Sequence, residues 1–353
     1  MADTQKINLL DLSMDQLTHL VMAWGEPRFR AAQIWRWIYH TLTDDPGEMG
    51  NLPAGLRQRL LEETEILHLP VVATSEADDG LTEKVAFQTQ DGQLVETVLM
   101  RYTNRNTVCV SSQIGCPVGC TFCATGRGGF VRDLTTGEIT AQVLHFAQRL
   151  QRENAHVTNI VFMGMGEPML NFDAVWQSVL NLNDRQGLAL GIRRFTISTV
   201  GIVPGIERLA REGLAVGLAV SLHSPDDRMR NQLIPVNRRY PLARLMDAVR
   251  LYIERTGRRV TFEYAMADGV NDSDEQAQAT ARLLHGLLAH VNLIPMNYVE
   301  GAAFQPSSRE RVLRFQEILV QAGIQTTVRV TRGADIQAAC GQLRSLLADE
   351  QEG

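Results

Sequence analysis

Hydrophobic and polar positions follow a helical period through the first part of the chain. Apolar residues recur three and four positions apart across residues 28–42, and residues 53–66 fit a further short helix. Ser13 is a suitable N-cap for a helix over residues 15–24. We therefore expect a small helical accessory domain over residues 1–67.

The pattern changes to strand-like runs in the next segment. Residues 69–103 contain three runs that are rich in Val and Thr, which is typical of β-strands. Asp91 and Gly92 separate the last two runs and form a strong hairpin turn signal. These features predict a short β-hairpin element over residues 68–104 that leads into the main domain.

Short apolar runs alternate with stretches of helical length from residue 106 onward. The runs are TVCVSSQ, NIVFMG, RFTISTV, AVGLAVSLH, VTFEYAMA, HVNLIPM and TTVRV. The helical stretches include 135–151, 171–184, 241–256, 272–288 and 306–322. This alternation predicts βαβ units around a parallel sheet. We expect an α/β fold built on a partial (β/α)6-type barrel over residues 105–346. The number of βα units also allows a closed barrel. A flexible tail is expected at residues 347–353.

Composition narrows the class of protein. The chain has 353 residues, of which 44% are hydrophobic and 21% charged, enough for a sizeable core. No apolar stretch approaches the roughly 18–20 residues that span a bilayer, and the N-terminus lacks the basic and apolar regions of a signal peptide. We therefore expect a cytoplasmic protein.

The formal net charge of −6 is not typical of a general polyanion binder. Arginines nevertheless occur in close groups, so a local basic face for RNA remains open, beside the simpler interpretation as solvated surface. The groups are Arg28, Arg30 and Arg36; Arg193 and Arg194; Arg238 and Arg239; and Arg258 and Arg259.

The five cysteines indicate metal or redox chemistry. They are Cys109, Cys116, Cys120, Cys123 and Cys340. An odd number in a chain without a secretory signal does not indicate a disulfide framework. Four of the five fall within fifteen residues, and such clustering is typical of a metal site.

Cys116, Cys120 and Cys123 form a CxxxCxxC motif directly after the first strand of the α/β region. Four thiolates saturate a [4Fe–4S] cluster, so three leave one iron open. An open iron can bind the amino and carboxylate groups of S-adenosylmethionine, and one electron then cleaves this molecule to a 5′-deoxyadenosyl radical. The motif therefore predicts a radical-SAM enzyme.

The motif also allows three other interpretations. Structural zinc sites usually take four ligands from paired knuckles, and no second knuckle is present. A saturated electron-transfer cluster would need Cys109 as its fourth ligand, which is awkward for a residue within a strand. The third alternative is that the cysteines are inert buried thiols.

Polar residues follow the predicted strands where a cofactor site would need them. The glycines of Gly164-Met165-Gly166-Glu167-Pro168 would let the backbone approach a ligand closely, and Glu167 could bind an ammonium group. Each residue alone could be an ordinary strand-end polar group. The candidate cofactor-binding residues are Gly166, Glu167, Ser198, Ser221, Leu222, His223 and Asn297.

The fifth cysteine, Cys340, lies far downstream in the segment Ala339-Cys340-Gly341-Gln342-Leu343. With this segment included, essentially the whole chain resembles the RlmN-type adenine-C2 methyltransferases of 23S rRNA and tRNA. This family is related to the Cfr C8-methyltransferases. The resemblance lies in the long motifs CVSSQIGCPVGCTFCATG, GMGEP, SLH, IPMN and RGADIQAACGQL. The helical N-terminal part also looks like the family's.

The resemblance implies specific roles for three further residues. Cys340 matches a cysteine that is methylated to S-methylcysteine, and Cys109 matches the partner with which it forms a transient disulfide. Glu96 matches a proton acceptor, although without the resemblance an ordinary carboxylate on an edge strand is as good an interpretation. The candidate cofactor-binding residues match the family's SAM-binding positions.

The resemblance also implies an activity and its partners. The product would be adenosine methylated at C2 in 23S rRNA and tRNA, formed through a covalent protein–RNA adduct with two SAM molecules per turnover. An electron donor such as flavodoxin and a monomeric enzyme are expected. The alternatives are C8 methylation and a non-enzymatic iron–sulfur module that binds RNA. The helical domain, Arg127, Arg132 and either Trp35 or Trp37 are candidate RNA contacts.

Overall fold

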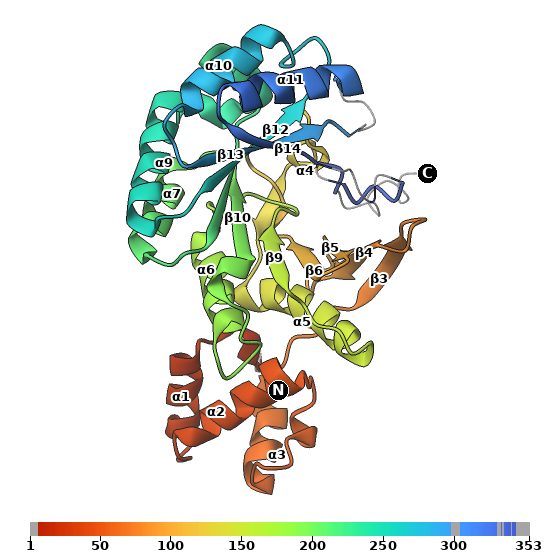
Figure 1. Ribbon diagram of the computed structural model, residues 1–353. Coiled ribbons are helices and arrows are strands. Elements are labelled where there is room, and N and C mark those ends of the chain that lie inside the picture. The colour runs from red at the N-terminus through yellow and green to blue at the C-terminus, as the bar shows by residue number, and fades with distance from the viewer. Residues whose placement is uncertain (1–5, 298–303, 330–332, 334, 340, 344–353) are drawn as a thin grey trace.

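The computed structural model describes residues 6–297, 304–329, 333, 335–339 and 341–343, and Figure 1 shows it as a ribbon. The tail predicted at 347–353 lies outside the described residues. A ten-stranded sheet forms the centre of the described part, in the order β14-β13-β12-β11-β10-β9-β6-β5-β4-β3. This sheet and the helices around it confirm the predicted α/β class.

Seven neighbouring strands of this sheet run parallel. They are β6 (Arg105–Val110), β9 (Asn159–Phe162), β10 (Phe195–Thr199), β11 (Gly217–Ser221), β12 (Val260–Met266), β13 (Ala289–Pro295) and β14 (Gln325–Val328). Strand β14 does not pair back to the other end of the sheet within the described residues. The barrel is therefore partial, and the closed alternative is wrong.

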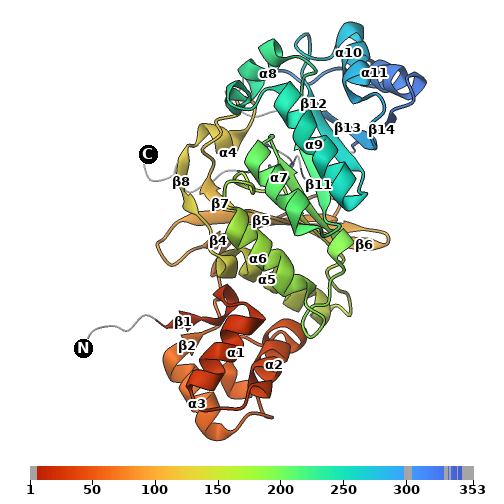
Figure 2. The same ribbon diagram turned by 90° about the vertical axis from the view of Figure 1, so that its left-hand side faces the viewer.

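Helices cover the outer face of the parallel strands, as Figure 2 shows for α5, α6, α7 and α9. They are α5 (Thr136–Arg152), α6 (Phe172–Asn183), α7 (Val203–Glu212), α9 (Leu242–Thr256), α10 (Asp274–Leu284) and α11 (Arg309–Gln321). Five of them match the helical stretches expected from the sequence. Helix α7 was not among those stretches; Pro204 lies in its first turn and Gly213 ends it in a left-handed conformation.

The three strand-like runs before residue 103 continue the same sheet in antiparallel orientation. They are β3 (Val71–Glu76), β4 (Thr82–Gln88) and β5 (Leu94–Tyr102). The predicted turn lies between β4 and β5, where Gly92 adopts a φ of +81°, a value that glycine tolerates without strain. Because β5 pairs with β6, this hairpin region is joined directly to the parallel strands.

The N-terminal residues fold into short helices, as the hydrophobic pattern predicts. They are α1 (Met14–Ala23), α2 (Phe29–Arg36), a π-helical turn (Trp37–Thr41) and α3 (Ala54–Glu63). Ser13 caps α1 in a reciprocal capping box with Gln16. The Nδ2 of Asn181 on α6 donates to the carbonyl of Leu12 at 3.1 Å, which ties these helices to the main body.

Alternation along the parallel strands separates an apolar outer face from a more polar inner face. On β10, Phe195 and Ile197 are almost fully buried under the helices, whereas Thr196 and Ser198, which alternate with them, are half-buried. The main core therefore lies between the sheet and its helices. Among the described residues, no helix is both long and apolar enough to cross a membrane.

Candidate active site at the carboxyl ends of the parallel strands

A pocket lies where the parallel strands end, and most of the predicted site residues line it. Those that line it are Cys116, Cys120, Cys123, Gly166, Glu167, Ser198, Ser221, His223 and Asn297. Leu222, Cys109 and Glu96 are not among its lining residues. Cys340 lies outside the described residues, but Gly341 and Leu343 that follow it line the pocket.

A short two-stranded ribbon holds the cysteine loop. Strand β7 (Gln113–Gly115) precedes the loop, and after α4 (Ala124–Arg127) the chain returns as β8 (Phe130–Asp133) and pairs with β7. A Cβ atom at Gly115 would lie 2.1 Å from the carbonyl oxygen of Gly129. The glycine is therefore needed for the close approach of the two strands that bracket the three cysteines.

The cysteines lie in an apolar environment that disfavours free thiolates. Burial raises the pKa of Cys116 to about 12 and raises that of Cys120 well above its usual value. A cationic iron centre supplies the positive charge that such thiolates need, and a coordinating thiol loses its proton.

The donor set fits an iron–sulfur cube better than a single ion. Within the described residues, no three His, Cys, Asp or Glu side chains group closely enough to hold a metal ion. A [4Fe–4S] cluster takes each thiolate on a different iron, so its ligands need only line a common pocket.

Glu167 is the buried carboxylate of the pocket. Its Oε2 accepts a hydrogen bond from the Val200 amide at 2.8 Å, and its Oε1 accepts one from the Met169 amide at 3.1 Å. Burial raises the pKa of Glu167 to about 7, and these hydrogen bonds partly oppose the rise. The carboxylate therefore has a fixed orientation at the pocket wall.

The glycines before Glu167 allow this loop to pack against the end of β6. Gly166 has a φ of +96°, and a Cβ atom there would lie 2.5 Å from the Cβ of Gln113. At Gly164 a Cβ atom would lie 2.6 Å from the hydroxyl of Ser111. The backbone of the GMGEP motif consequently lies against the chain that leads to the cysteines.

His223 is a neutral, buried imidazole. Its Nδ1 accepts a hydrogen bond from the Ala265 amide at 3.0 Å, and its ring contacts Phe122 edge-on at 4.9 Å between centroids. Burial, followed by the charge of Arg230, lowers the pKa of His223 to about 3. Because Nδ1 accepts, the proton of the neutral ring is on Nε2.

Two buried charged residues at the site were missed by sequence reasoning. Arg230, on α8 (Asp227–Leu233), donates from Nε to the carbonyl of Leu222 at 3.1 Å and from Nη2 to that of Ser221 at 2.9 Å. Glu263 lines the pocket and accepts a hydrogen bond from Nδ2 of Asn292 at 2.8 Å. The alternation of the VTFEYAM run could have placed Glu263 on the inner face, but no local signal marks Arg230.

Cys109 and Glu96 share one face of the sheet beside the pocket. Cys109 on β6 is buried and pairs directly with Val98 on β5. Glu96 lies two residues before Val98, so its side chain points to the same face. Its Oε1 is 2.9 Å from the Nζ of Lys84. The edge-strand interpretation of Glu96 is wrong, because β5 lies between β4 and β6 and the side chain is only 2% exposed.

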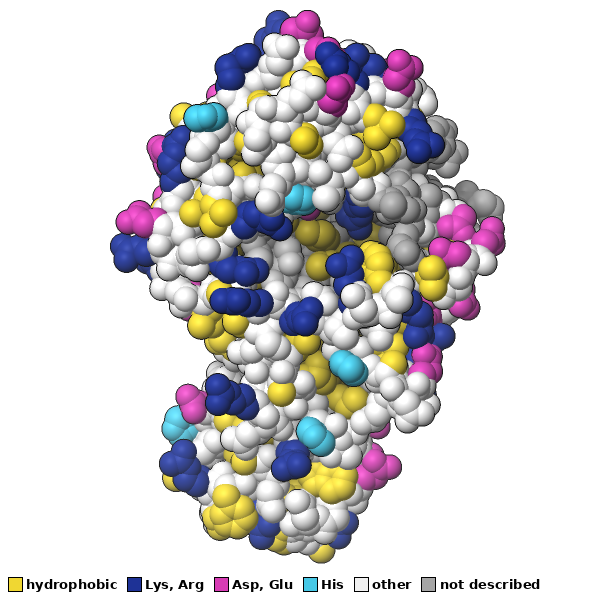
Figure 3. Space-filling model, viewed as in Figure 1, with side chains coloured by type: hydrophobic (Ala, Val, Ile, Leu, Met, Phe, Trp, Pro, Cys, Tyr) yellow, Lys and Arg dark blue, Asp and Glu magenta, His cyan; other side chains and the backbone are white. Residues whose placement is uncertain are grey.

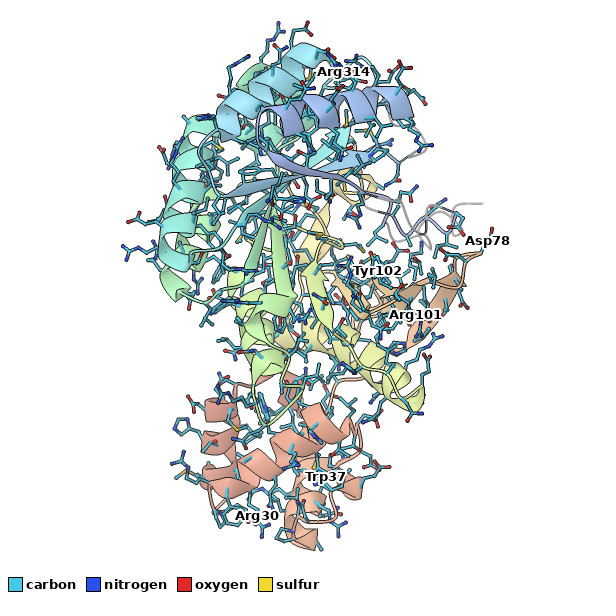
Figure 4. The ribbon with its side chains drawn as sticks, viewed as in Figure 1. Arg30, Trp37, Asp78, Arg101, Tyr102 and Arg314 are labelled. Carbon is cyan, nitrogen blue, oxygen red and sulfur yellow. The ribbon has the colours of Figure 1, made fainter. Side chains whose placement is uncertain are left out.

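The candidate RNA contacts fall in different places. Arg132 forms ion pairs with Asp91 and Glu138, both at 2.8 Å, so its guanidinium already has protein partners. Trp35 is buried, whereas Trp37, labelled in Figure 4, is half-buried and donates from Nε1 to Oδ1 of Asn51 at 2.7 Å. Both tryptophans contact the main hydrophobic core, Trp35 as a buried member and Trp37 as a partly buried neighbour, so RNA contact by either stays a prediction.

Several of the grouped arginines gather near the amino ends of the parallel strands. Arg193 and Arg194 directly precede β10, and Arg258 and Arg259 directly precede β12. Figure 3 shows Lys and Arg side chains collected in the middle of the face that it presents. The chain thus carries a local basic region despite its net negative charge.

Two family models match the chain, and together they define its class. Residues 110–281 match the Radical SAM superfamily, and residues 7–66 match the ribosomal RNA large subunit methyltransferase N-terminal domain. The first match contains the cysteine loop and many of the strand ends around the pocket. The protein is a radical-SAM methyltransferase, whose cofactors are a [4Fe–4S] cluster and S-adenosylmethionine.

Similar proteins narrow the class to a family. A protein of Chloroflexus aurantiacus described as a probable dual-specificity RNA methyltransferase RlmN is 51% identical over 346 residues, 95% of this chain and 92% of its own. One of Roseiflexus sp. with the same description is 47% identical over 381 residues, 95% and 96% of the two chains. The chain belongs to the RlmN family of dual-specificity RNA methyltransferases.

A solved structure supports the fold assignment. A radical SAM methyltransferase from Sphaerobacter thermophilus superposes with a TM-score of 0.93 and 52% sequence identity, over 96% of this chain and 99% of that one. The similarity therefore includes the antiparallel strands and the N-terminal helices as well as the parallel strands.

Proposed function

We propose that this chain methylates C2 of a specific adenosine in 23S rRNA and in tRNA. The observation that carries the proposal is the pocket in which three cysteines meet the strand-end polar residues, with Cys109 and Glu96 on the strands beside it. C2 lies between two ring nitrogens and is electron-poor. It does not attack a sulfonium methyl group, but a carbon radical can add to it.

In this proposal Cys116, Cys120 and Cys123 hold the [4Fe–4S] cluster and leave one iron for the amino and carboxylate groups of SAM. When bound, the cluster supplies the electron that cleaves SAM. The residues proposed to bind and orient SAM are Gly166, Glu167, Ser198, Ser221, Leu222, His223 and Asn297. Leu222 would act through its backbone, because its side chain is fully buried outside the pocket lining.

Cys340 carries the methyl group. Its thiolate takes a methyl group from a first SAM by displacement, and this forms S-methylcysteine. Cleavage of a second SAM would supply the radical that takes a hydrogen atom from the methyl group on Cys340. The resulting carbon radical adds to C2, so protein and RNA become joined through the Cys340 sulfur.

Glu96 and Cys109 complete the reaction in this proposal. The adduct would return one electron to the cluster that was oxidised when SAM was cleaved, and Glu96 would accept the C2 proton. The Cys109 thiolate then attacks the sulfur of Cys340; the carbon leaves with the bonding electrons and takes a proton, which gives the methyl group. The two cysteines are left as a disulfide, which cellular thiols reduce by ordinary exchange.

The proposal extends to partners and organisation. A flavodoxin-like donor would supply electrons to a monomeric enzyme in the cytoplasm. Residues 1–67 would contact the RNA as an accessory domain, residues 68–104 would form the hairpin element, and residues 105–346 would carry out the chemistry.

Mass spectrometry of nucleosides from 23S rRNA and tRNA treated with the reconstituted enzyme tests the proposal. We expect 2-methyladenosine. If 8-methyladenosine is the sole product, the reaction is of the C8 type. If anaerobic incubation with reductant and SAM yields no 5′-deoxyadenosine while RNA still binds, the chain is a binding module. Cys340→Ala should abolish methylation and leave the iron content unchanged.

A further inference from the structure

A buried ion pair lies on the sheet face that contains Cys109. The Nζ of Lys84 is 2.9 Å from the Oε1 of Glu96, and the two side chains are only 5% and 2% exposed. Lys84 on β4 pairs with Val98 on β5, which pairs in turn with Cys109 on β6. Adjacent strands lie about 4.8 Å apart, so the ammonium is on the order of 10 Å from the Cys109 position across the sheet.

Stability alone is a weak reason for this pair. Removing two charges from water is costly, and replacing a buried ion pair by apolar side chains of similar size is often neutral or stabilising. An apolar residue already lies beside the pair, because Val98 on the strand of Glu96 lies directly between Lys84 and Cys109. A pair of charges at this place therefore points to a role in the reaction.

Lys84 also contacts the C-terminal segment, which we define as described residues 333, 335–339 and 341–343. Its Nζ donates to the carbonyl of Gln337 at 3.4 Å. Nearby, the amide of Asp78 donates to Oδ2 of Asp335 at 3.0 Å. Figure 4 shows Asp78 at the tip of the hairpin formed by β3 and β4. The hairpin thus holds the segment at more than one point.

The other end of the C-terminal segment is fixed beside the cysteine loop. The amide of Ala124 donates to the carbonyl of Gly341 at 2.8 Å, and the hydroxyl of Thr125 donates to the carbonyl of Leu343. The described part of the segment therefore touches the hairpin on one side of Cys340 and α4 on the other. Lys84 contacts both the carboxylate of Glu96 and the carbonyl of Gln337, so it links Glu96 to the part of the segment that precedes Cys340.

We propose that Lys84 is a positioning residue that couples the carboxylate of Glu96 to the C-terminal segment. Its ammonium orients Glu96 on the face of Cys109 and favours the ionised, proton-accepting form. The same ammonium fixes the chain three residues before Cys340. The inference rests on the proposed function, in which Glu96 accepts the C2 proton.

The second ion pair on β4 lies on the face of the sheet opposite to Glu96. Glu83 and Arg149 form an ion pair, but Glu83 precedes Lys84 on the strand and so points to the opposite face. On its own face Glu96 forms an ion pair with the ammonium of Lys84 from β4, and Cys109 on β6 lies on the same face, paired with Val98. The C-terminal segment contributes the carbonyl of Gln337, while the carboxylate of Asp335 is bound to Asp78.

Lys84→Met removes the charge and keeps an apolar stem of similar length. We expect formation of 2-methyladenosine to fall at least tenfold at neutral pH, while S-methylation of Cys340 and 5′-deoxyadenosine formation continue, since both precede the Glu96 step. The activity should recover as the pH rises, because a carboxylate without its ammonium partner ionises at higher pH. Lys84→Arg should restore most of the wild-type rate.

Arg149→Met is the matched control, because it breaks the ion pair on the opposite face of the same strand. We expect it to leave the rate and the pH profile unchanged. Lys84→Met with wild-type product formation and an unshifted pH profile overturns the proposal, and so does a Lys84→Arg variant as slow as Lys84→Met.

A second readout does not depend on catalysis. Hydrogen exchange of the peptide that contains Gln337 should be several-fold faster in Lys84→Met than in wild type and Arg149→Met, and unchanged exchange refutes the link to the segment. If Lys84→Met does not fold, Lys84→Gln, which also removes the charge, takes its place in both measurements, and Lys84→Arg remains the rescue variant. A wild-type enzyme that makes no 2-methyladenosine overturns the proposed function, whereas the exchange result still decides the structural link.

Discussion

The guanidinium of Arg230 donates a hydrogen bond to the carbonyl of Ser221 at 2.9 Å, so a fully buried cation on α8 holds the end of β11. The same side chain donates to the carbonyls of Leu222 and Val200. Three strand-end carbonyls around the pocket thus accept from a single arginine, which is not among the pocket-lining residues; the carbonyl of Leu222 also accepts from the Ser224 amide at 2.7 Å.

Arg230→Met should therefore weaken both folding and SAM binding. The carbonyls of Val200, Ser221 and Leu222 would lose a donor in a buried place, and each unsatisfied polar group costs about 1–3 kcal/mol. We expect the free energy of unfolding to fall by about 3 kcal/mol in urea denaturation. Arg250→Met, which removes a partner from an exposed ion pair with Asp247, should stay within about 0.5 kcal/mol of wild type.

Gly164→Ala should destabilise the loop that carries Glu167. The new methyl group would lie 2.6 Å from the Ser111 hydroxyl and 2.8 Å from the carbonyl of Val110, so the backbone must shift. We expect a loss of about 1–3 kcal/mol in unfolding free energy, measured by chemical denaturation. Gly191→Ala introduces the same methyl group where no atom lies within 4 Å and should be nearly neutral. Equal stability of the two variants would contradict the close packing.

The imidazole of His223 predicts a pH dependence of stability. Burial lowers the pKa of His223 from 6.5 to about 3, so between these values the unfolded chain binds a proton that the folded chain does not. The free energy of unfolding should consequently fall as the pH falls through this window. Between pH 7 and pH 5 the contribution is about 2 kcal/mol, at about 1.4 kcal/mol per pKa unit.

His223→Gln isolates this contribution, because the amide oxygen can accept from the Ala265 amide without titrating. Urea denaturation at pH 7 and at pH 5 should show a smaller loss of stability in the variant than in wild type. Identical losses would mean that His223 does not keep its lowered pKa in the folded protein.

Cys109→Ala should stop the proposed reaction after the carbon–carbon bond has formed. Without a thiolate to attack the sulfur of Cys340, the RNA should remain covalently attached to the protein. A denaturing gel of labelled RNA after anaerobic turnover should show the adduct. Val98→Ala, which alters the residue paired with Cys109 but keeps the thiol, should release free RNA. Free RNA and no adduct from Cys109→Ala would refute the release step.

Local signals in the sequence predict local structure well. The Ser13 cap appears where its hydroxyl can reach the amide of Gln16, because an N-cap depends on residues only a few positions apart. The cysteine motif likewise lies within eight consecutive residues and could be interpreted without knowing the fold. The alternation of runs from residue 106 onward was sufficient for the parallel sheet.

Contacts between distant residues could not be predicted in the same way. The interpretation of Glu96 as an edge-strand residue failed because pairing of β5 with β6 depends on the whole sheet. The pairing of Lys84 with Glu96 joins two strands, and the contact between Lys84 and Gln337 joins residues 253 positions apart. Arg230 carries no motif, since its role depends on carbonyls from two other strand ends.

Within the described part of the chain, the hydrogen-bond ladder of the sheet begins at β14 and ends at β3 without returning to its start. In a closed barrel, the number of strands and their stagger determine the diameter, but an open ladder has no fixed circumference. The described parts of the C-terminal segment contact both the hairpin and α4, so the segment bridges two elements whose separation the open ladder does not fix.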